Sequence, residues 1–302
     1  MHIILRKIWL YSLRKIILFN PKYVNTIERA IFGVCKYKAC NVIIKTQYFQ
    51  LERMEMANNT ISIPAVRLRN DETFSFSCRK ELECFNRCCR DINLFLTPYD
   101  ILRIKRRLKL PSYEFLRTYT FPLFPEEVGH PVILMKMVPD ETKNCPFVSD
   151  EGCMIYDDRP WSCRSFPLEP VTENTDPEFE LVKRDFCLGF TGNKKHSVKK
   201  WRDTQNIGFY EDMNNEWKKV THHESFGTLN LLEGEARDMF FLVSYNIDEF
   251  RNMVFHGDFL NYFDIDKKEL KKIRSDETEL LRFAFKWLRH VLFRESTVKR
   301  IS

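Results

Sequence analysis

The chain has 302 residues, which is enough for one large or two modest domains with a hydrophobic core. Hydrophobic residues make up 44% of the sequence and charged residues 30%, and the 9 Gly and 13 Pro argue against a disordered or low-complexity protein. The net charge of +6 lies at one end, because residues 1–53 carry ten Lys or Arg and two acidic residues (+8), which leaves +6 − 8 = −2 for the remainder. A body without excess positive charge argues against a nucleic-acid partner.

Residues 1–59 form a basic N-terminal extension that differs from the rest of the chain. Within residues 1–20, Arg and Lys interrupt the apolar residues, so no run is long enough to span a bilayer or to act as an export signal. Three interpretations stay open: an amphipathic helix packed on the body, a weak contact of residues 1–20 with a membrane surface, or natural translation from Met54 or Met56.

The first predicted elements follow this extension. Residues 73–77 alternate polar and aromatic side chains, which indicates a strand. Thr97 is a good helix N-cap, and Pro98 suits the first helical position, so a helix is predicted to run to residue 110. Ser112 is predicted to cap a second, short helix.

Two more strands and a turn are predicted in the middle of the chain. Residues 131–138 and 178–182 have the composition of strands, and residues 149–152 (Ser-Asp-Glu-Gly) form a turn signal. These segments predict a small antiparallel sheet.

Helical periodicity dominates the last third of the chain. Apolar residues recur at helical spacing over 196–219, 229–245 and 267–293. The predicted fold class is therefore α+β: a cysteine-rich, metal-stapled domain (60–190) with a small antiparallel sheet, followed by a mostly helical region (191–302).

The ten cysteines are unevenly distributed. Eight lie between Cys78 and Cys187, whereas Cys35 and Cys40 stand apart and are interpreted as incidental. Since the sequence shows no export signal, a reducing cytoplasm is the expected location, and clustered cysteines in that compartment indicate metal binding rather than disulfides.

The eight clustered cysteines have a spacing that suits metal coordination. Thiolates are soft, anionic ligands for zinc and iron, and short spacings allow one loop to present several of them. The predicted ligands are Cys78, Cys84, Cys88, Cys89, Cys145, Cys153, Cys163 and Cys187. Because adjacent side chains diverge, Cys88 and Cys89 are expected to serve different sites or one site and the core.

Residues between the cysteines suggest supporting roles. Arg159 and Arg164 are expected to offset thiolate charge or lower thiolate pKa values. Tyr156, Trp161 and Phe166 are expected to form an aromatic wall that excludes water from the metal. Asp100 is expected to compensate a helix dipole.

Several ordered motifs resemble one known family. They are Cys78…Cys84…Cys88-Cys89-Arg90, Leu96-Thr97-Pro98-Tyr99-Asp100, Cys145-Pro146-Phe147, Gly152-Cys153-x-Ile155-Tyr156 and Arg159-Pro160-x-x-Cys163-Arg164-x-Phe166-Pro167. Together they are similar to the YkgJ-type cysteine-cluster proteins, which are described as zinc- or iron-chelating and in some cases as iron–sulfur proteins. This chain departs from the family's commonest motif, CxxCxxCC, because its spacing is wider (CRKELECFNRCC) and no Gly precedes the adjacent pair.

The resemblance implies a protein that chelates zinc or iron through clustered thiolates, with a 4Fe-4S cluster as one form of the metal. The alternative is an iron–sulfur enzyme that acts on a protein side chain, because the broad family includes flagellin lysine N-methylases. No P-loop, dinucleotide fingerprint or Ser–His–Asp arrangement supports a specific reaction. The metal ion is the expected partner, and the sequence identifies no protein partner.

Overall fold

The computed structural model describes residues 66–125, 128–171, 177–224, 232 and 234–301. Among these residues, 66–251 and 265–299 belong to a large unit, and 252–264 with 300–301 to a small one. The predictions for residues 1–59, including the membrane contact and the start at Met54 or Met56, lie outside the described residues, as do Cys35 and Cys40. Within the described ranges, none of the helices has both the length and the apolar character that crossing a membrane requires.

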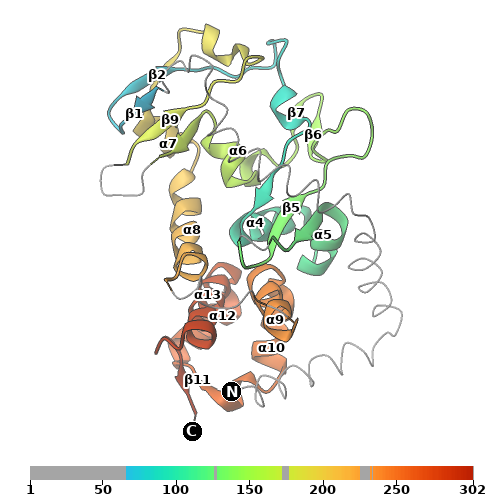
Figure 1. Ribbon diagram of the computed structural model, residues 1–302, viewed down its shortest axis with the longest axis vertical. Coiled ribbons are helices and arrows are strands. Elements are labelled where there is room, and N and C mark those ends of the chain that lie inside the picture. Colours follow the sequence, from blue (N-terminus) through green and yellow to red (C-terminus); the bar gives the residue numbers. More distant parts are fainter. Residues whose placement is uncertain (1–65, 126–127, 172–176, 225–231, 233, 302) are drawn as a thin grey trace. The chain divides into compact units, whose positions relative to one another are not determined.

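The strands of the large unit are short and antiparallel. One three-stranded sheet has the order β1 (Arg67–Leu68), β9 (Phe179–Leu181), β8 (Leu168–Pro170), and a second has the order β3 (Phe95–Leu96), β5 (Val132–Met135), β4 (Thr120–Leu123). Two pairs complete the set: β2 (Thr73–Ser75) with β10 (Lys195–Ser197), and β6 (Val148–Ser149) with β7 (Gly152–Cys153). The strands predicted over 73–77, 131–138 and 178–182 and the turn at 149–152 are confirmed, although the strands form several small sheets (Figure 1).

Strand pairing brings together the two ends of the cysteine-containing segment. Phe74 on β2 lies opposite His196 on β10, and Leu68 on β1 lies opposite Phe179 on β9. Beside these pairs lies a core of buried apolar residues: Leu68, Phe74, Phe76, Leu168, Phe179 and Val198. Burial of such side chains stabilises the fold by about 25 cal/mol per Å² of apolar surface.

Helix α4 (Pro98–Leu108) begins as the sequence predicts. Thr97 is its N-cap, its hydroxyl accepts a hydrogen bond from the Asp100 N–H, and the Asp100 carboxylate accepts the Thr97 N–H at 2.8 Å. This reciprocal arrangement is a capping box, which satisfies N–H groups that a helix start otherwise leaves unpaired. The helix ends at Leu108, and the next residue, Lys109, is its C-cap with a positive φ of 55°.

Helix α5 (Ser112–Tyr119) does not begin as predicted. Its N-cap is Pro111, and Ser112 is the first helical residue rather than the cap. The Ser112 N–H instead donates to the Asp248 carboxylate at 2.6 Å. A carboxylate from a distant part of the chain has thus taken the role that local sequence assigned to a serine hydroxyl.

The remaining elements are mostly helical. They are the 3₁₀ helices η1 (Arg87–Cys89), η2 (Tyr156–Asp158) and η3 (Leu188–Thr191), the helices α6 (Trp161–Ser165), α7 (Val198–Thr204), α8 (Ile207–Thr221), α9 (Gly234–Tyr245), α10 (Ile247–His256), α11 (Phe259–Tyr262), α12 (Lys267–Ser275) and α13 (Glu277–Phe293), and the strands β11 (Phe263–Asp264) and β12 (Lys299–Arg300). This content confirms the α+β class with a mostly helical C-terminal part.

Two helices that periodicity predicts as continuous are each divided in two. The stretch 196–219 breaks between α7 and α8, where Asn206 adopts a left-handed conformation with φ of 52°. The stretch 267–293 breaks at Asp276, which ends α12 and caps α13 by accepting the Thr278 N–H at 2.7 Å. Both breaks keep the apolar spacing nearly in phase, so the hydrophobic pattern does not reveal them.

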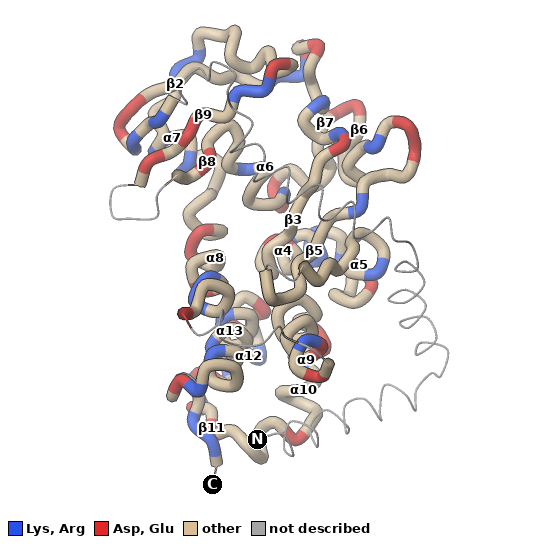
Figure 2. The backbone as a smooth tube through the Cα atoms, viewed as in Figure 1, with Lys and Arg blue, Asp and Glu red and all other residues tan. Residues whose placement is uncertain are grey.

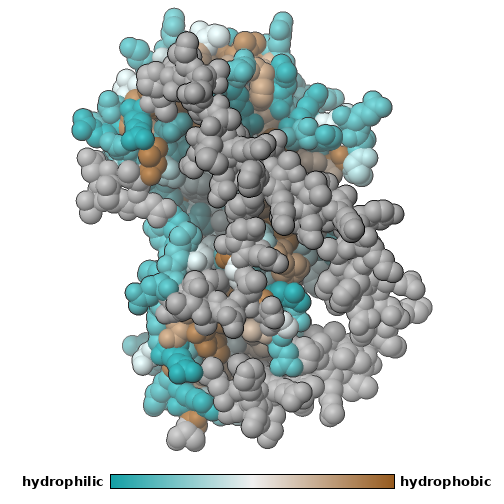
Figure 3. All heavy atoms as spheres, in the orientation of Figure 1, coloured by the Kyte–Doolittle hydropathy of each residue, from teal (hydrophilic) through white to brown (hydrophobic). Residues whose placement is uncertain are grey.

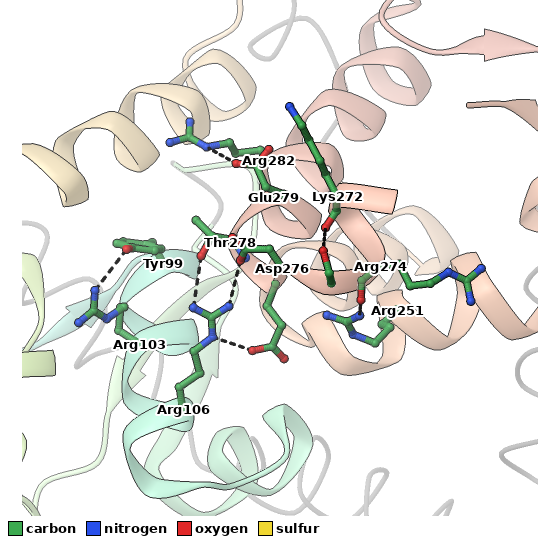
Figure 4. A network of polar contacts seen from close by, with 12 residues as sticks. Tyr99, Arg103, Arg106, Arg251, Lys272, Arg274, Asp276, Thr278, Glu279 and Arg282 are labelled. Carbon is green, nitrogen blue, oxygen red and sulfur yellow. Dashed lines mark hydrogen bonds and ion pairs between the residues drawn. The ribbon is translucent and has the colours of Figure 1, made fainter. Parts of the chain in front are cut away.

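Packing around α13 forms the helical core of the large unit. This helix contacts α4, α8, α9 and α12. Trp217 on α8 lies 5.4 Å from the Phe240 ring and 5.2 Å from the Phe285 ring, measured between centroids. At the start of α13, Arg106 donates to Asp276 and Thr278 (Figure 4). On the face in Figure 3, hydrophilic residues cover much of the described surface, with apolar patches between them.

Candidate metal centre

All eight cysteines that the sequence predicts as ligands lie in the described residues, and all are free thiols. Cys78, Cys84, Cys88 and Cys89 lie in the loop that ends with η1, Cys145 precedes the β6–β7 hairpin, and Cys153 is on β7; Cys163 is on α6, and Cys187 precedes η3. Figure 1 shows β6, β7 and α6 in one part of the large unit. The chain therefore delivers thiols to this region from four separate places.

Backbone hydrogen bonds hold these places together. The Cys145 N–H donates to the Cys89 carbonyl at 2.7 Å, and the neighbouring residues Arg90 and Asn144 form a β-bridge. At the start of the first cysteine loop, the Ser77 N–H donates to the Gly189 carbonyl at 2.8 Å. The first cysteine loop is thus fastened both to the segment before the hairpin and to the segment that carries Cys187.

Four thiols form a first group. The Leu188 N–H donates to the Cys84 sulfur at 3.2 Å, which places Cys187 beside Cys84. Burial, followed by the charges of Cys88, Cys84 and Cys187, raises the pKa of Cys78 to about 11. We define the first thiol group as Cys78, Cys84, Cys88 and Cys187.

The other four thiols form a second group. Although Cys163 has exposed surface, many atoms surround its sulfur, and this desolvation raises its pKa to about 12, with Cys145 and Cys153 among the charges that add to it. The pKa of Cys89 is raised mainly by its hydrogen bond with Cys88 and by burial. The charges of Cys145 and Cys163 add smaller contributions in the same direction. We define the second thiol group as Cys89, Cys145, Cys153 and Cys163.

The two groups meet at the adjacent pair Cys88 and Cys89, whose sulfurs lie 4.0 Å apart. Their hydrogen bond lowers the pKa of Cys88 and raises that of Cys89, because the Cys89 S–H is the donor that stabilises a Cys88 thiolate. Within the described ranges, no three His, Cys, Asp or Glu side chains have the geometry to hold a metal ion. The two thiol groups are therefore defined by electrostatic neighbours, and Cys88 lies between them because its charge also raises the pKa of Cys153 and Cys163.

Backbone N–H groups that point at the sulfurs make these thiols suitable metal ligands. The N–H groups of Phe147, Ile155 and Gly189 lower the pKa of Cys145, Cys153 and Cys187 respectively, although burial has the larger, opposite effect. In each case the donor is two residues after the cysteine. A hydrogen bond to sulfur favours the thiolate over the thiol, and thiolate is the form that binds metal. The donor set therefore fits zinc or iron.

Two arginines add positive charge near the thiols. Arg184 lowers the pKa of Cys88, and Arg159 lowers that of Cys153, although neither is the largest influence. The expectation for Arg159 agrees with this geometry. Arg164 instead donates to the backbone carbonyls of Arg159, Gln205 and Asp157. It organises the chain around α6.

Comparison with known families was consistent with this geometry. Residues 77–188 match the family model CxxCxxCC, described as "Putative zinc- or iron-chelating domain". Residues 77–188 are therefore similar to this family, and the name CxxCxxCC domain is used below for this segment. This similarity agrees with the cysteine-cluster resemblance seen in the sequence motifs. No curated protein and no solved structure matches the chain.

The glycine that directly follows the matched segment, Gly189, is required by close packing. A Cβ atom on Gly189 would lie 2.5 Å from a ring carbon of Phe76, which is 3% exposed. The missing side chain lets the backbone after Cys187 lie against this ring, and the N–H of Gly189 thereby reaches the Cys187 sulfur. A buried aromatic core residue thus helps to position a predicted ligand.

Asp100 has a larger role than dipole compensation. Besides its part in the capping box, its carboxylate accepts the Trp161 N–H at 2.8 Å and so joins the start of α4 to the start of α6. Burial raises the pKa of Asp100 to about 6. Asp100 therefore fixes the helix that carries Cys163.

The expected aromatic wall is only partly present. Trp161 and Phe166 are partly buried, but Tyr156 is 56% exposed and packs on the Arg159 guanidinium, 3.8 Å from its ring centroid. The expectation for Tyr156 is wrong because its ring covers an arginine instead of the thiols. Sequence reasoning also missed Arg184 and the backbone N–H donors. A cation three residues before Cys187 was visible in the sequence, but the donors had no side-chain signal.

Proposed function

We propose that the CxxCxxCC domain binds zinc or iron through two four-thiolate sites, one in each thiol group. The observation that supports this proposal is the gathering of eight free thiols into two groups of electrostatic neighbours, with backbone N–H donors aimed at several of the sulfurs. Four thiolates provide a tetrahedral set for zinc and also the ligands of a 4Fe-4S cluster. Cys88 and Cys89 would each belong to a different site.

Metal bound at these sites would supply folding energy by linking segments that are far apart in the sequence. The chain's own residues prepare the sites: Asp100 fixes α6, Gly189 positions the turn at Cys187, and Arg159 and Arg184 offset negative charge. Because such a cluster of close thiols would otherwise cross-link by oxidation, the proposal includes a reducing compartment such as the cytoplasm.

The alternative of an iron–sulfur enzyme resembling lysine N-methylases gains no support from the electrostatics. Beside Arg159 lies a cavity that is also lined by Arg103 and Arg164. Three guanidinium groups would repel the ammonium group of a lysine substrate. We therefore propose metal binding itself as the function.

The test is anaerobic purification of the full chain, followed by elemental analysis and a visible spectrum. About two zinc ions per chain without colour would support two structural zinc sites. Stoichiometric iron and sulfide with a broad band near 400 nm would support iron–sulfur ligation by the same thiols. If the purified protein contained neither zinc nor iron at a stoichiometric level, the proposal would be contradicted.

Single substitutions distinguish two sites from one shared centre. Cys187→Ser removes a ligand from the first thiol group and Cys163→Ser from the second, so each variant should lose about half of the metal. Cys35→Ser, outside both groups, is the control and should keep all of it. If Cys187→Ser and Cys163→Ser each lost all metal, a single centre would replace the two-site proposal.

A further inference from the structure

A cavity of about 260 Å³ lies in the large unit next to the second thiol group. Its lining includes three arginines, Arg103, Arg159 and Arg164, together with Asp157, Thr204 and Gln205. Arg159 connects the cavity to the thiols, because its charge also acts on Cys153. The walls are therefore predominantly polar and cationic.

Two of the three arginines are buried and donate hydrogen bonds only to uncharged groups. Arg159 is 7% exposed and Arg164 3% exposed. Arg159 donates to the Tyr156 carbonyl and the Gln205 side-chain oxygen, and Arg164 donates to three backbone carbonyls. Across the described residues, neither guanidinium forms an ion pair with a carboxylate.

A buried charge without a counter-charge is costly, and proteins usually provide a partner for it. The third arginine has one, because Arg103 donates to the Asp158 carboxylate through Nε at 2.9 Å. The lining itself carries three positive charges and one negative charge, from Asp157, for a balance of +3 − 1 = +2. Outside the lining, the carboxylates of Asp158 and Asp100 act on Arg103 and Arg164 respectively, so Arg159 is the lining arginine without a carboxylate partner among the described residues.

We propose that this cavity binds a small oxyanion-bearing molecule, with a carboxylate or phosphate group held by Arg159 and Arg164. A guanidinium has five N–H donors in a planar fork that matches these groups. The contacts described above use two donors of Arg159 and three of Arg164, so donors remain for a ligand.

The volume of the cavity limits the size of the ligand. At about 260 Å³, it is smaller than the range of about 300–1,000 Å³ typical of pockets for drug-sized ligands. The polar side chains of Thr204 and Gln205 suit a hydrophilic molecule rather than an acyl chain. The ligand class is therefore a small, hydrophilic carboxylate or phosphate. This inference goes beyond metal binding, although the two sites share Arg159, whose charge also acts on Cys153.

The direct test titrates the full-length protein, as purified, with two probes: inorganic phosphate and succinate. Isothermal titration calorimetry at constant ionic strength would measure saturable binding. Binding of phosphate alone would assign a phosphate site, and binding of succinate alone a carboxylate site. Absence of saturable binding for both would overturn the proposal.

An isosteric substitution makes the test specific. Gln205→Glu places a carboxylate against Arg159 and supplies the missing counter-charge inside the protein. The variant should fold at least as stably as the wild type, yet bind the probe at least tenfold more weakly. Its metal content should equal that of the wild type, which separates this effect from any loss of metal.

The matched control is Asn70→Asp, which makes the same amide-to-carboxylate change opposite Arg202, outside the cavity. This variant should bind the probe with wild-type affinity. Equal affinity for the probe in the wild type and in Gln205→Glu would overturn the proposal. An equal loss of affinity in Gln205→Glu and Asn70→Asp would also overturn it, because the effect would then come from net charge alone.

Discussion

At the scale of single residues, Lys105 shows how charge is accommodated in the core. Its side chain is 6% exposed, and its ammonium group lies 2.8 Å from Asp248 and 2.6 Å from Glu277. Asp248 also accepts the N–H at the start of α5. One buried cation and two carboxylates therefore join α4, α5, α10 and α13.

Replacing Asp248 by Asn should lower the free energy of unfolding by about 1–3 kcal/mol at pH 7, since the partly buried lysine would lose one of its charged partners. Burial alone would raise the pKa of Asp248, but the hydrogen bonds from Lys105 and Ser112 outweigh it and lower the pKa. The carboxylate's contribution is thus present above the unfolded pKa of about 3.9 and lost as the pH falls through the folded pKa. Urea denaturation should show the difference between the two proteins shrinking below about pH 4.

The control for this prediction is Asp238→Asn. Asp238 pairs with Arg237 on the surface, and its side chain is 55% exposed. Surface pairs contribute about 0–1 kcal/mol, so this variant should unfold almost like the wild type at both pH values. Equal losses in the two variants would contradict a special role for the buried cluster.

Gly189→Ala tests the close contact behind Cys187. The new methyl group would collide with the Phe76 ring, so we expect a loss of about 1–3 kcal/mol and a lower metal content. Gly208→Ala is the matched control, because nothing lies within 4 Å of its added Cβ atom and Ala favours the helix. Thermal unfolding and elemental analysis of both variants provide the measurement. Unchanged stability in Gly189→Ala would mean that Phe76 moves freely.

At the scale of elements, the start of α4 offers a further prediction. Thr97→Ala removes the hydroxyl half of the capping box and should cost about 1 kcal/mol of stability. Thr118→Ala, on the exposed side of α5, should change stability by less than about 0.5 kcal/mol. Chemical denaturation of the two variants side by side measures the difference. A loss in Thr97→Ala no larger than that in Thr118→Ala would show that the cap contributes nothing.

The elements also show what local sequence can predict. Thr97 and Pro98 define a helix start by side-chain chemistry that acts within one turn, so this start was predictable. The cap of α5 was not, because the Asp248 carboxylate that binds the Ser112 N–H is distant in sequence. The break at Asp276 was missed because apolar periodicity continues across it.

The candidate site also has features that the sequence could predict and features that it could not. The candidate thiols could be identified from the sequence, because eight cysteines lie between Cys78 and Cys187. Their separation into two groups could not be predicted, because it depends on tertiary contacts: the hydrogen bonds from Ser77 to Gly189 and from Leu188 to Cys84 bring Cys187 to the first loop. The expectation for Tyr156 was wrong because nearness in sequence to Cys153 did not determine what its ring contacts. The charge role of Arg164 stays a prediction, and its hydrogen bonds to backbone carbonyls were not visible in the sequence.

At the scale of the whole molecule, regular structure is unevenly distributed. The cysteine-containing part has strands of two to four residues, whereas α8 and α13 have 15 and 17 residues. Charged residues of both signs alternate along the described chain (Figure 2). Short strands contribute few backbone hydrogen bonds, so this part depends more on its proposed metal than the helices do.

Metal removal should therefore loosen the molecule locally. After treatment with a chelator, hydrogen exchange should speed up in residues 77–90 and 145–153, while α13 keeps its protection. Mass spectrometry of exchanged peptides resolves these segments. Uniform protection after complete metal removal would show that the thiols do not hold the fold, and uniform loss would show that the helices depend equally on metal.

The distance in sequence between Cys78 and Cys187 also orders events during biosynthesis. The second thiol group is complete once Cys163 has been made, whereas the first must wait for Cys187, at the far end of the CxxCxxCC domain. At about 5–20 residues per second, a ribosome takes about 5–20 s to travel from one end of this segment to the other. During that interval the earliest thiols are exposed without their last partner, and the nascent chain is then most open to oxidation or to capture of the wrong metal.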